Sequence, residues 1–321
     1  MTDAPDASFL APPGLVADWR MVLLVDAVAE AGVVPRLPGT AEEVAADLGL
    51  DPHALRVVLD ALGAWEIVER QGGTYVLGPA APDDATTAGL RHHARALRTW
   101  AGSIDDRLRG VAVGEGGGDR AGSPGTVRPE LFQQALARTA RTTAPAVVDL
   151  CLARVPHARS VLDLGGLHGE YSLEFTRRGL KATMQDLPQM IELAERQGDL
   201  QAAGVDLFAG SFFEVVPEGP FDLAFCAGIT HTFDGERNRD LYRNLRPVVS
   251  VDGGVAVVTF LRNRQPLADV FAVQMLVNAR GGDTHREEEY RAWLEECGFR
   301  VDDAVIDVPR RPQSILFAQP A

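Results

Sequence analysis

One stretch of the chain, VLDLGGLHGEYSLEF at residues 161–175, constrains the fold more than any other. Its first part is a short apolar run typical of a buried parallel strand, and its last part begins a helix. Between them, Gly165, Gly166 and Gly169 let the backbone turn sharply and approach a ligand closely. Ligands of open α/β sheets lie outside the carboxyl ends of the strands, which is where this turn falls. Taken alone, the stretch is also compatible with a tight connection that binds nothing.

Two acidic residues belong to the same region. Asp163 interrupts the apolar run, where an unpaired carboxylate is costly, so we expect it at the carboxyl end of the strand among hydrogen-bond donors. The stretch KATMQDLPQM predicts a second strand that ends at Asp186, about 20 residues after the turn, where a ribose-binding carboxylate falls. Pro188 suits the first turn of the following helix. The glycine spacing is not the G-x-G-x-x-G of dinucleotide-binding proteins.

Four motifs, in order, resemble those of the class I S-adenosylmethionine-dependent methyltransferases. They are LDLGGLHG at 162–169, QDLP at 185–188, GSFFE at 210–214 and THTFDGE at 230–236. More narrowly, the chain resembles the small-molecule methyltransferases that include plant and bacterial O-methyltransferases. The resemblance implies an α/β fold with a Rossmann-like seven-stranded sheet and an N-terminal, mainly helical, winged-helix dimerisation domain. It also implies S-adenosylmethionine as methyl donor, S-adenosylhomocysteine as product, and a homodimer.

The 321 residues leave room for two domains. Residues 1–110 are expected to form the dimerisation domain, 111–127 a glycine-rich linker, and 128–321 the cofactor-binding domain. The pattern of the first domain predicts three helices and a hairpin that turns at Gly72-Gly73. Such a module commonly binds DNA, but its third helix offers only Arg56 to a phosphate backbone, so a scaffold role is expected. Parallel strands are expected at 159–164, 181–186, 205–209, 221–227 and 255–261.

Composition restricts the partners. A net charge of −14 argues against nucleic acid and against an anionic membrane surface. The acidic N-terminus lacks an apolar signal core, and no uncharged run of ~18 apolar residues exists that could span a membrane. Cys151, Cys226 and Cys297 are widely separated and odd in number, which favours reduced thiols in the cytoplasm over disulfides or a zinc site.

The resemblance implies a cofactor site along the carboxyl edge of the sheet. It places the ribose hydroxyls near Asp186 and the adenine near Ser211 and Phe212. Leu167 stands where the family usually has glycine, and Ser211 where it often has aspartate. The residues assigned to the cofactor on this basis are Asp163, Gly165, Gly166, Gly169, Asp186, Leu187, Gly210, Ser211, Phe212 and Cys226.

His231 follows the strand FDLAFCAG and matches the position of the family's histidine general base. Histidine titrates near neutral pH and can take a proton from a hydroxyl. The family usually places a carboxylate beside this histidine and another after the fifth strand, where this chain has Thr232 and Thr259. His231 is therefore expected to be a weaker base, because no carboxylate orients the ring or stabilises its cation. Either the substrate is already acidic or activated, or the proton is not removed in this way.

The predicted function is methyl transfer to an oxygen or carbon of a small secondary metabolite. One alternative is a member that binds S-adenosylmethionine but hydroxylates its substrate or catalyses a pericyclic step. A second is metal-assisted C-methylation of an α-keto acid by His231 and His285, although two protein ligands make a poor facial site, so no metal is expected. A third is a winged-helix regulator with a decayed pocket. Phe271, Met275, Asn278 and His285 are the candidate substrate contacts.

Overall fold

The computed structural model describes residues 18–111, 129–279 and 281–321. Within these ranges the chain forms two compact units, and the division falls inside one long helix, between Arg98 and Thr99. The predicted linker, 111–127, lies outside the described residues except for Val111.

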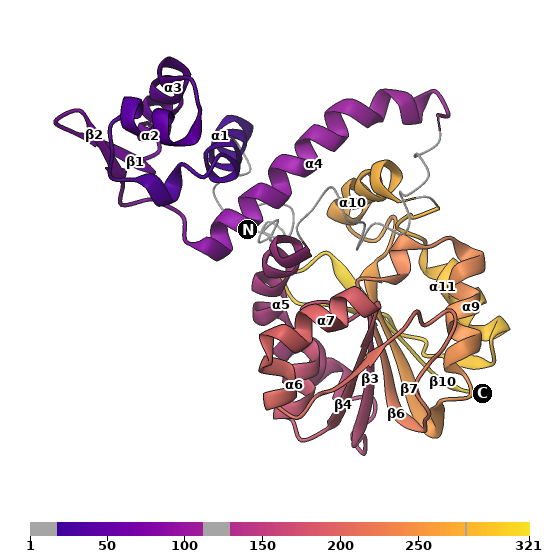
Figure 1. Ribbon diagram of the computed structural model, residues 1–321. Coiled ribbons are helices and arrows are strands. Elements are labelled where there is room, and N and C mark those ends of the chain that lie inside the picture. The colour runs from indigo at the N-terminus through magenta and orange to yellow at the C-terminus, as the bar shows by residue number, and fades with distance from the viewer. Residues whose placement is uncertain (1–17, 112–128, 280) are drawn as a thin grey trace. The chain divides into compact units, whose positions relative to one another are not determined.

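The N-terminal unit contains three helices, a hairpin and the first part of the long helix (Figure 1). The helix caps expected from its sequence are present. Thr40 and Glu43 form a capping box at the start of the second helix, and the Asp51 carboxylate caps the third at the Ala54 amide, 2.6 Å away. The elements are α1 (Trp19–Glu30), η2 (Val34–Arg36), α2 (Ala41–Leu48), α3 (Pro52–Gly63), β1 (Val68–Gln71), β2 (Thr74–Leu77) and α4 (Asp84–Leu108).

The C-terminal unit is built on one twisted sheet. Its strands run in the order β5-β4-β3-β6-β7-β10-β8, with the short β9 paired to β10. The first five strands in this order are parallel, and β10 is antiparallel to β7 and to β8. The order reverses between β3 and β6, which is the switch point where open α/β sheets bind ligands. The strands are β3 (Ser160–Leu164), β4 (Lys181–Asp186), β5 (Asp206–Ala209), β6 (Phe221–Ala227), β7 (Val249–Phe260), β8 (Phe299–Val301), β9 (Ile306–Asp307) and β10 (Gln313–Pro320).

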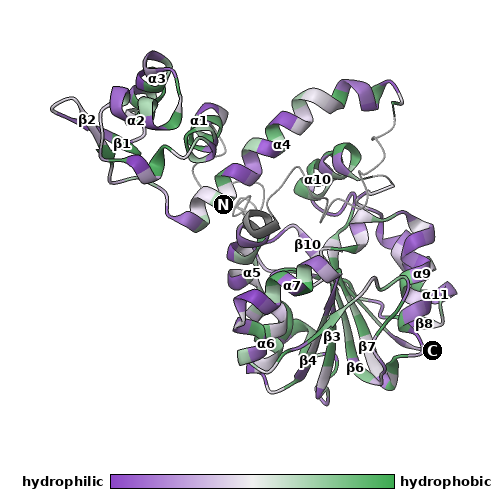
Figure 2. Cartoon of the chain, viewed as in Figure 1, coloured by the Kyte–Doolittle hydropathy of each residue, from purple (hydrophilic) through white to green (hydrophobic). Residues whose placement is uncertain are grey.

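Helices cover both faces of this sheet (Figure 1). Helices α5, α6 and α7 pack on one apolar face, and α9 and α11 on the other, so alternate residues of each central strand enter different cores. Figure 2 shows the resulting hydrophobic colouring along the strands. The helices and the one further turn are α5 (Pro129–Leu152), α6 (Glu170–Arg177), α7 (Pro188–Gln197), α8 (Asp199–Ala202), η3 (Thr230–Thr232), α9 (Gly235–Leu245), α10 (Pro266–Asn278) and α11 (Glu287–Glu296).

The mixed α/β fold predicted from the sequence is confirmed, and its strands differ mainly at one place. β7 begins at Val249 rather than at 255, because a register irregularity in its pairing with β6 accommodates the segment that contains Asp252 and two glycines.

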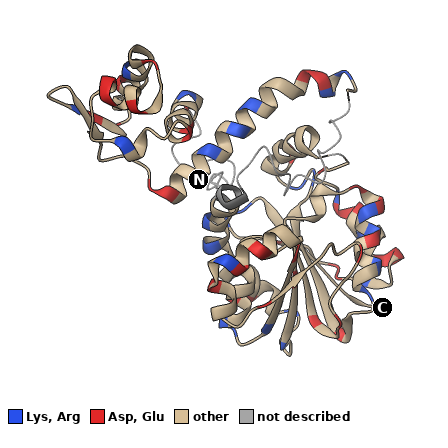
Figure 3. Cartoon of the chain, in the orientation of Figure 1, with Lys and Arg blue, Asp and Glu red and all other residues tan. Residues whose placement is uncertain are grey.

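Charged residues lie mostly on helices and at strand ends, and the middle of the sheet has few of them (Figure 3). In the described part of the chain, every helix is too short or too polar to cross a bilayer.

The packing between β7 and β10 yields a stability prediction. A Cβ atom added at Gly254 would lie 2.3 Å from Cζ of the buried Phe317 ring. Gly254→Ala is therefore expected to destabilise the protein by about 1–3 kcal/mol through overpacking. Gly102→Ala is the control, since its Cβ meets nothing within 4 Å and alanine favours a helix. Urea unfolding of both variants measures the difference, and equal stabilities would contradict the prediction.

Candidate functional site

The glycine turn after β3 is held by backbone hydrogen bonds and close packing. The Gly165 amide donates to the Gln185 carbonyl at 2.8 Å, and the Gly169 amide donates to Gly166 at 2.8 Å. Gly165 and Gly169 have φ values of 64° and 69°, a region that favours glycine. A Cβ at Gly165 would also lie 2.5 Å from Cγ2 of Ile229. The turn therefore has no room for side chains at these positions.

Asp186 ties this turn to the next one. Its Oδ2 accepts from the Leu167 amide at 2.9 Å, and its Oδ1 accepts from the Leu187 amide at 2.7 Å. Burial raises the pKa of Asp186, while the two amide hydrogen bonds act in the opposite direction. Each carboxylate oxygen keeps a further lone pair for a hydroxyl donor. The carboxylate can thus organise the turn and still accept hydrogen bonds from a diol.

Leu167, the residue that departs from the family pattern, lies in this turn with a φ of 41°. A left-handed conformation is strained for leucine, so the surroundings must hold it there. The Leu167 carbonyl accepts from Nε2 of Gln133 at 3.1 Å, and Gln133 is in turn paired with Gln197 of α7. Sequence reasoning did not find Gln133, because it lies 34 residues before Leu167 and only the packing of α5 brings them together.

Asp163 lies beneath the turn and is 1% exposed. Its Oδ2 accepts from the Ser172 hydroxyl at 2.6 Å. Burial raises the pKa of Asp163 to about 7; the Ser172 hydrogen bond opposes this rise and the nearby charge of Asp186 adds to it. Hydrogen bonding to this acid, which was expected from the sequence, is thus supplied by Ser172.

Aromatic rings gather where the adenine was expected. The ring of Phe212 lies 4.7 Å from that of Phe213 and 5.9 Å from that of Phe233, measured between centroids. Before them, Gly210 follows β5 and the Ser211 hydroxyl accepts from the Phe213 amide at 3.3 Å. Cys226, by contrast, is wholly buried in the apolar core of the sheet, so its thiol faces other core side chains.

His231 lies in the η3 turn that follows β6, at the same edge of the sheet. It is 5% exposed, and its ring packs edge-to-face against Phe260 and Phe271, at centroid distances of 5.6 and 5.0 Å. Its Nδ1 atom is buried and has no hydrogen-bond partner among the residues that the structure describes. Burial lowers the pKa of His231 to about 3, and His285 adds to the effect. The imidazole is therefore neutral near pH 7.

The two threonines that replace the expected carboxylates do not orient this ring. The Thr232 hydroxyl donates to the Ile229 carbonyl at 2.6 Å. The Thr259 hydroxyl lies 3.3 Å from the Tyr290 hydroxyl, with which Thr230 also pairs at 3.0 Å. These contacts fix the turn that carries His231 rather than the imidazole itself.

His285 approaches the same turn from the loop before α11. Its Nε2 donates to the Phe233 carbonyl at 2.7 Å, and its ring packs against Tyr290 and Trp293. Burial lowers the pKa of His285. The nitrogen that donates to a carbonyl is protonated and cannot ligate a metal at the same time. Among the described residues, no three His, Cys, Asp or Glu side chains are grouped as metal ligands.

The remaining candidate substrate residues lie on α10. Phe271 stacks on Phe260 with centroids 4.0 Å apart, which places both rings over His231. Met275 is buried, and the Asn278 amide donates to the Gln274 carbonyl at 2.8 Å. Helix α10 thus contributes Phe271 to the apolar surroundings of His231. Its polar groups also bond outside the helix, since Gln274 accepts from Trp100 at 2.5 Å and the Leu276 carbonyl accepts from Arg107 at 2.9 Å.

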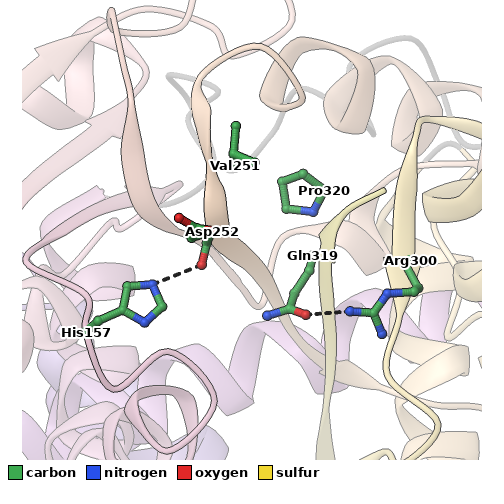
Figure 4. Close-up of a pocket in the computed structure, with 6 residues that line it drawn as sticks. All are labelled: His157, Val251, Asp252, Arg300, Gln319 and Pro320. Atoms are coloured by element: carbon green, nitrogen blue, oxygen red, sulfur yellow. Dashed lines mark hydrogen bonds between the residues drawn. The ribbon is translucent and has the colours of Figure 1, made fainter.

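A shallow cavity of about 480 Å³ lies at the opposite, amino edge of the sheet (Figure 4). Two polar contacts lie within it: His157 contacts the Asp252 carbonyl at 3.0 Å, and Arg300 donates to Gln319 at 2.7 Å. Val251 on its rim is 83% exposed. The cavity is far from the glycine turn and from His231, which lie beyond the other ends of the strands, so it is not the candidate site.

Comparison with known proteins agrees with this geometry. Residues 125–300 match a family described as the O-methyltransferase domain. The chain is 30% identical over 305 residues to the 3-amino-4-hydroxybenzoate 4-O-methyltransferase of Streptomyces cremeus, an alignment that covers 87% of this chain and 79% of that protein. It is 27% identical over 289 residues to the N,N-dimethyltransferase OxyT of Streptomyces rimosus, covering 83% of each. The fold is similar to that of human N-acetylserotonin methyltransferase in complex with SAM, with a TM-score of 0.71, 21% identity and full coverage of both chains.

The chain therefore belongs to the O-methyltransferase domain family. It is an S-adenosylmethionine-dependent methyltransferase that acts on small natural products. The resemblance identified from the four sequence motifs is confirmed.

The raised pKa of Asp163 predicts how stability depends on pH. An aspartate titrates near pH 4 when unfolded, and Asp163 near 7 when folded, so the folded state binds more protons between these values. The contribution of this group to stability is present below about pH 4 and is lost as pH rises to about 7. Relative to the wild type, Asp163→Asn is expected to gain up to about 1.4 kcal/mol per pH unit across this window.

Urea unfolding of both proteins from about pH 4.5 to about pH 8 measures this difference. Asparagine keeps an acceptor for the Ser172 hydroxyl, so the comparison isolates the ionisation. A difference that does not change with pH would show that Asp163 is ionised throughout.

Proposed function

We propose that S-adenosylmethionine binds along the carboxyl edge of β3, β4, β5 and β6. The groups present fit this molecule: a carboxylate suits a ribose diol, an aromatic ring suits a purine face, and a turn with three glycines admits close approach. Asp186 would hold the ribose and Phe212 would contact the adenine. Gly165, Gly166, Gly169, Leu187, Gly210 and Ser211 would line the remainder, with Asp163 and Cys226 behind them.

His231 is the proposed catalytic residue. The observation that supports this assignment is its position on the turn after β6, at the same sheet edge as the Asp186 turn. When bound, S-adenosylmethionine supplies an electrophilic methyl group on a sulfonium sulfur. The protein contributes mainly by holding an oxygen or carbon nucleophile in line with that methyl group and excluding water. Phe271, Met275, Asn278 and His285 are proposed to shape the substrate pocket, and no metal is proposed.

We propose that residues 1–110 form a winged-helix-like dimerisation domain, 111–127 a linker and 128–321 the catalytic domain. Three helices and a hairpin support the first assignment. Exposed apolar side chains in this region support a homodimer, Trp19 above all, which is 59% exposed on α1. Free cysteines at 151, 226 and 297 support a cytoplasmic location. Neither nucleic acid nor a membrane is a proposed partner.

Cofactor binding is the direct test of the proposed site. Titration calorimetry with S-adenosylhomocysteine should give saturable binding, and Asp186→Ala should weaken it at least tenfold by removing the acceptor of two ribose hydroxyls, each worth about 1 kcal/mol or more. Asp206→Ala is the matched control, because this acid begins the neighbouring strand at the opposite edge and pairs with Lys181. Melting temperatures separate lost binding from lost folding, since Asp186 also holds two turn amides. No binding by the wild type would refute the site.

The proposed homodimer predicts a molecular mass twice that of one chain by light scattering. Trp19→Glu should shift the protein towards monomer, because a charge at an apolar interface loses its hydration. Val251→Glu is the control, since Val251 is equally apolar and 83% exposed but lies at the amino edge of the catalytic sheet. A wild-type monomer that remains active on dilution would refute the dimerisation role.

A further inference from the structure

We propose that His231 meets the substrate as a hydrogen-bond donor through Nε2–H, and that the enzyme takes oxygen nucleophiles that are already anionic, such as acidic phenols or enols. The proposal rests on the proposed function, because it assumes that His231 faces the nucleophile. This inference goes beyond the proposed function because it assigns a tautomer to the His231 ring and a charge to the substrate.

The first observation is the isolation of Nδ1. A neutral imidazole carries one N–H, and Nε2 can act as a base only when that hydrogen is on Nδ1. Within residues 18–111, 129–279 and 281–321, Nδ1 is buried without a partner, and the ring is flanked by Phe260 and Phe271. An aromatic face is a much weaker acceptor than an oxygen. Hydrogen on Nδ1 would therefore be a buried N–H that no ligand can satisfy, whereas hydrogen on Nε2 remains available to a substrate.

The second observation concerns three described polar side chains near the turn that carries the ring, each of which has a partner other than the imidazole. The Asp283 amide donates to the His231 carbonyl at 2.9 Å, but the Asp283 carboxylate is paired with the Arg262 guanidinium. The hydroxyls of Thr232 and Thr259 bond to Ile229 and Tyr290. The position of each group is thus set by a contact that does not involve the imidazole.

The third observation is the cost of a charged ring. A general base must become an imidazolium, which needs an acceptor for both N–H groups and a nearby negative charge. His285 is the nearby titratable group that affects the ring, and it disfavours that charge. The lowered pKa of His231, about 3, agrees with this reading of the geometry.

These observations select the substrate class. An anionic oxygen accepts a hydrogen bond from Nε2–H, and a charge-assisted bond of this kind is stronger than a neutral one. An alcohol of ordinary pKa would require a base, and a neutral amine would require an acceptor rather than a donor. During transfer the new O–CH3 or, for an enolate, C–CH3 bond forms as the C–S bond breaks, and the bonding pair leaves with sulfur. No proton is released, since the nucleophile lost its own before binding.

The tautomer can be measured without turnover. The full chain is labelled with 15N-histidine, and the His231→Ala variant assigns the His231 signals. We expect long-range 1H–15N spectra to show a protonated Nε2 and an unprotonated Nδ1 from about pH 6 to about pH 8, with and without S-adenosylhomocysteine. A hydrogen on Nδ1, or a charged ring in this range, would overturn the proposal.

The substrate charge is tested with 4-nitrophenol, whose phenolate absorbs at longer wavelength than the phenol. With S-adenosylhomocysteine present, the bound probe should ionise about tenfold more readily than the free probe, the size expected for one charge-assisted hydrogen bond. His231→Gln keeps an amide donor and should preserve part of this shift, whereas His231→Leu should abolish it. A probe that binds as the neutral phenol, or does not bind the wild type, would remove acidic phenols from the substrate class. Calorimetry with S-adenosylhomocysteine on the same samples tests the proposed cofactor site separately, because it measures cofactor binding without the phenol.

Discussion

The carboxylate of Asp186 is the contact on which the carboxyl edge of the sheet depends. It accepts from the amides of Leu167 and Leu187, and so joins the turn after β3 to the turn after β4. Without it, the strained Leu167 and the flexible glycines of the turn would have fewer contacts that hold them in one conformation. Gln133 supports the same turn from α5 through the Leu167 carbonyl. The site is thus preorganised by hydrogen bonds to backbone groups, which are available before any ligand arrives.

The turn that carries His231, the proposed catalytic residue, is also held by hydrogen bonds to its backbone, but the His231 ring has apolar surroundings. The Tyr290 hydroxyl bonds to the Thr230 hydroxyl, and His285 donates to the Phe233 carbonyl. The Asp283 amide donates to the His231 carbonyl. The imidazole itself touches aromatic rings. A rigid backbone with an unpaired, neutral ring favours positioning over proton transfer. In this respect the chain departs from the histidine–carboxylate arrangement that its family resemblance implies.

Much of the fold could be predicted because its signals are local. The Thr40–Glu43 capping box, the Asp51-Pro52 helix start and the Gly72-Gly73 hairpin each depend on a few neighbouring residues, and each is present. The parallel strands β4 and β6 have the expected bounds, because glycine and proline residues flank both of them in the sequence. The early start of β7 was not predicted, since Asp252 and two glycines conceal a segment that only pairing with β6 makes a strand.

The sequence alone determined the class of enzyme, because each of the four motifs that carry the family resemblance consists of consecutive residues. It also placed Asp186 and His231 at one edge, since the carboxyl ends of parallel strands meet there. Only the tertiary structure decided how side chains are engaged. The Gln133 contact to Leu167, the pairing of Asp283 with Arg262 and the donation from His285 to Phe233 join residues 21 to 52 positions apart. The isolation of Nδ1 in His231 is of the same kind, because it depends on which side chains the packing of α10 and the neighbouring loops brings to the ring.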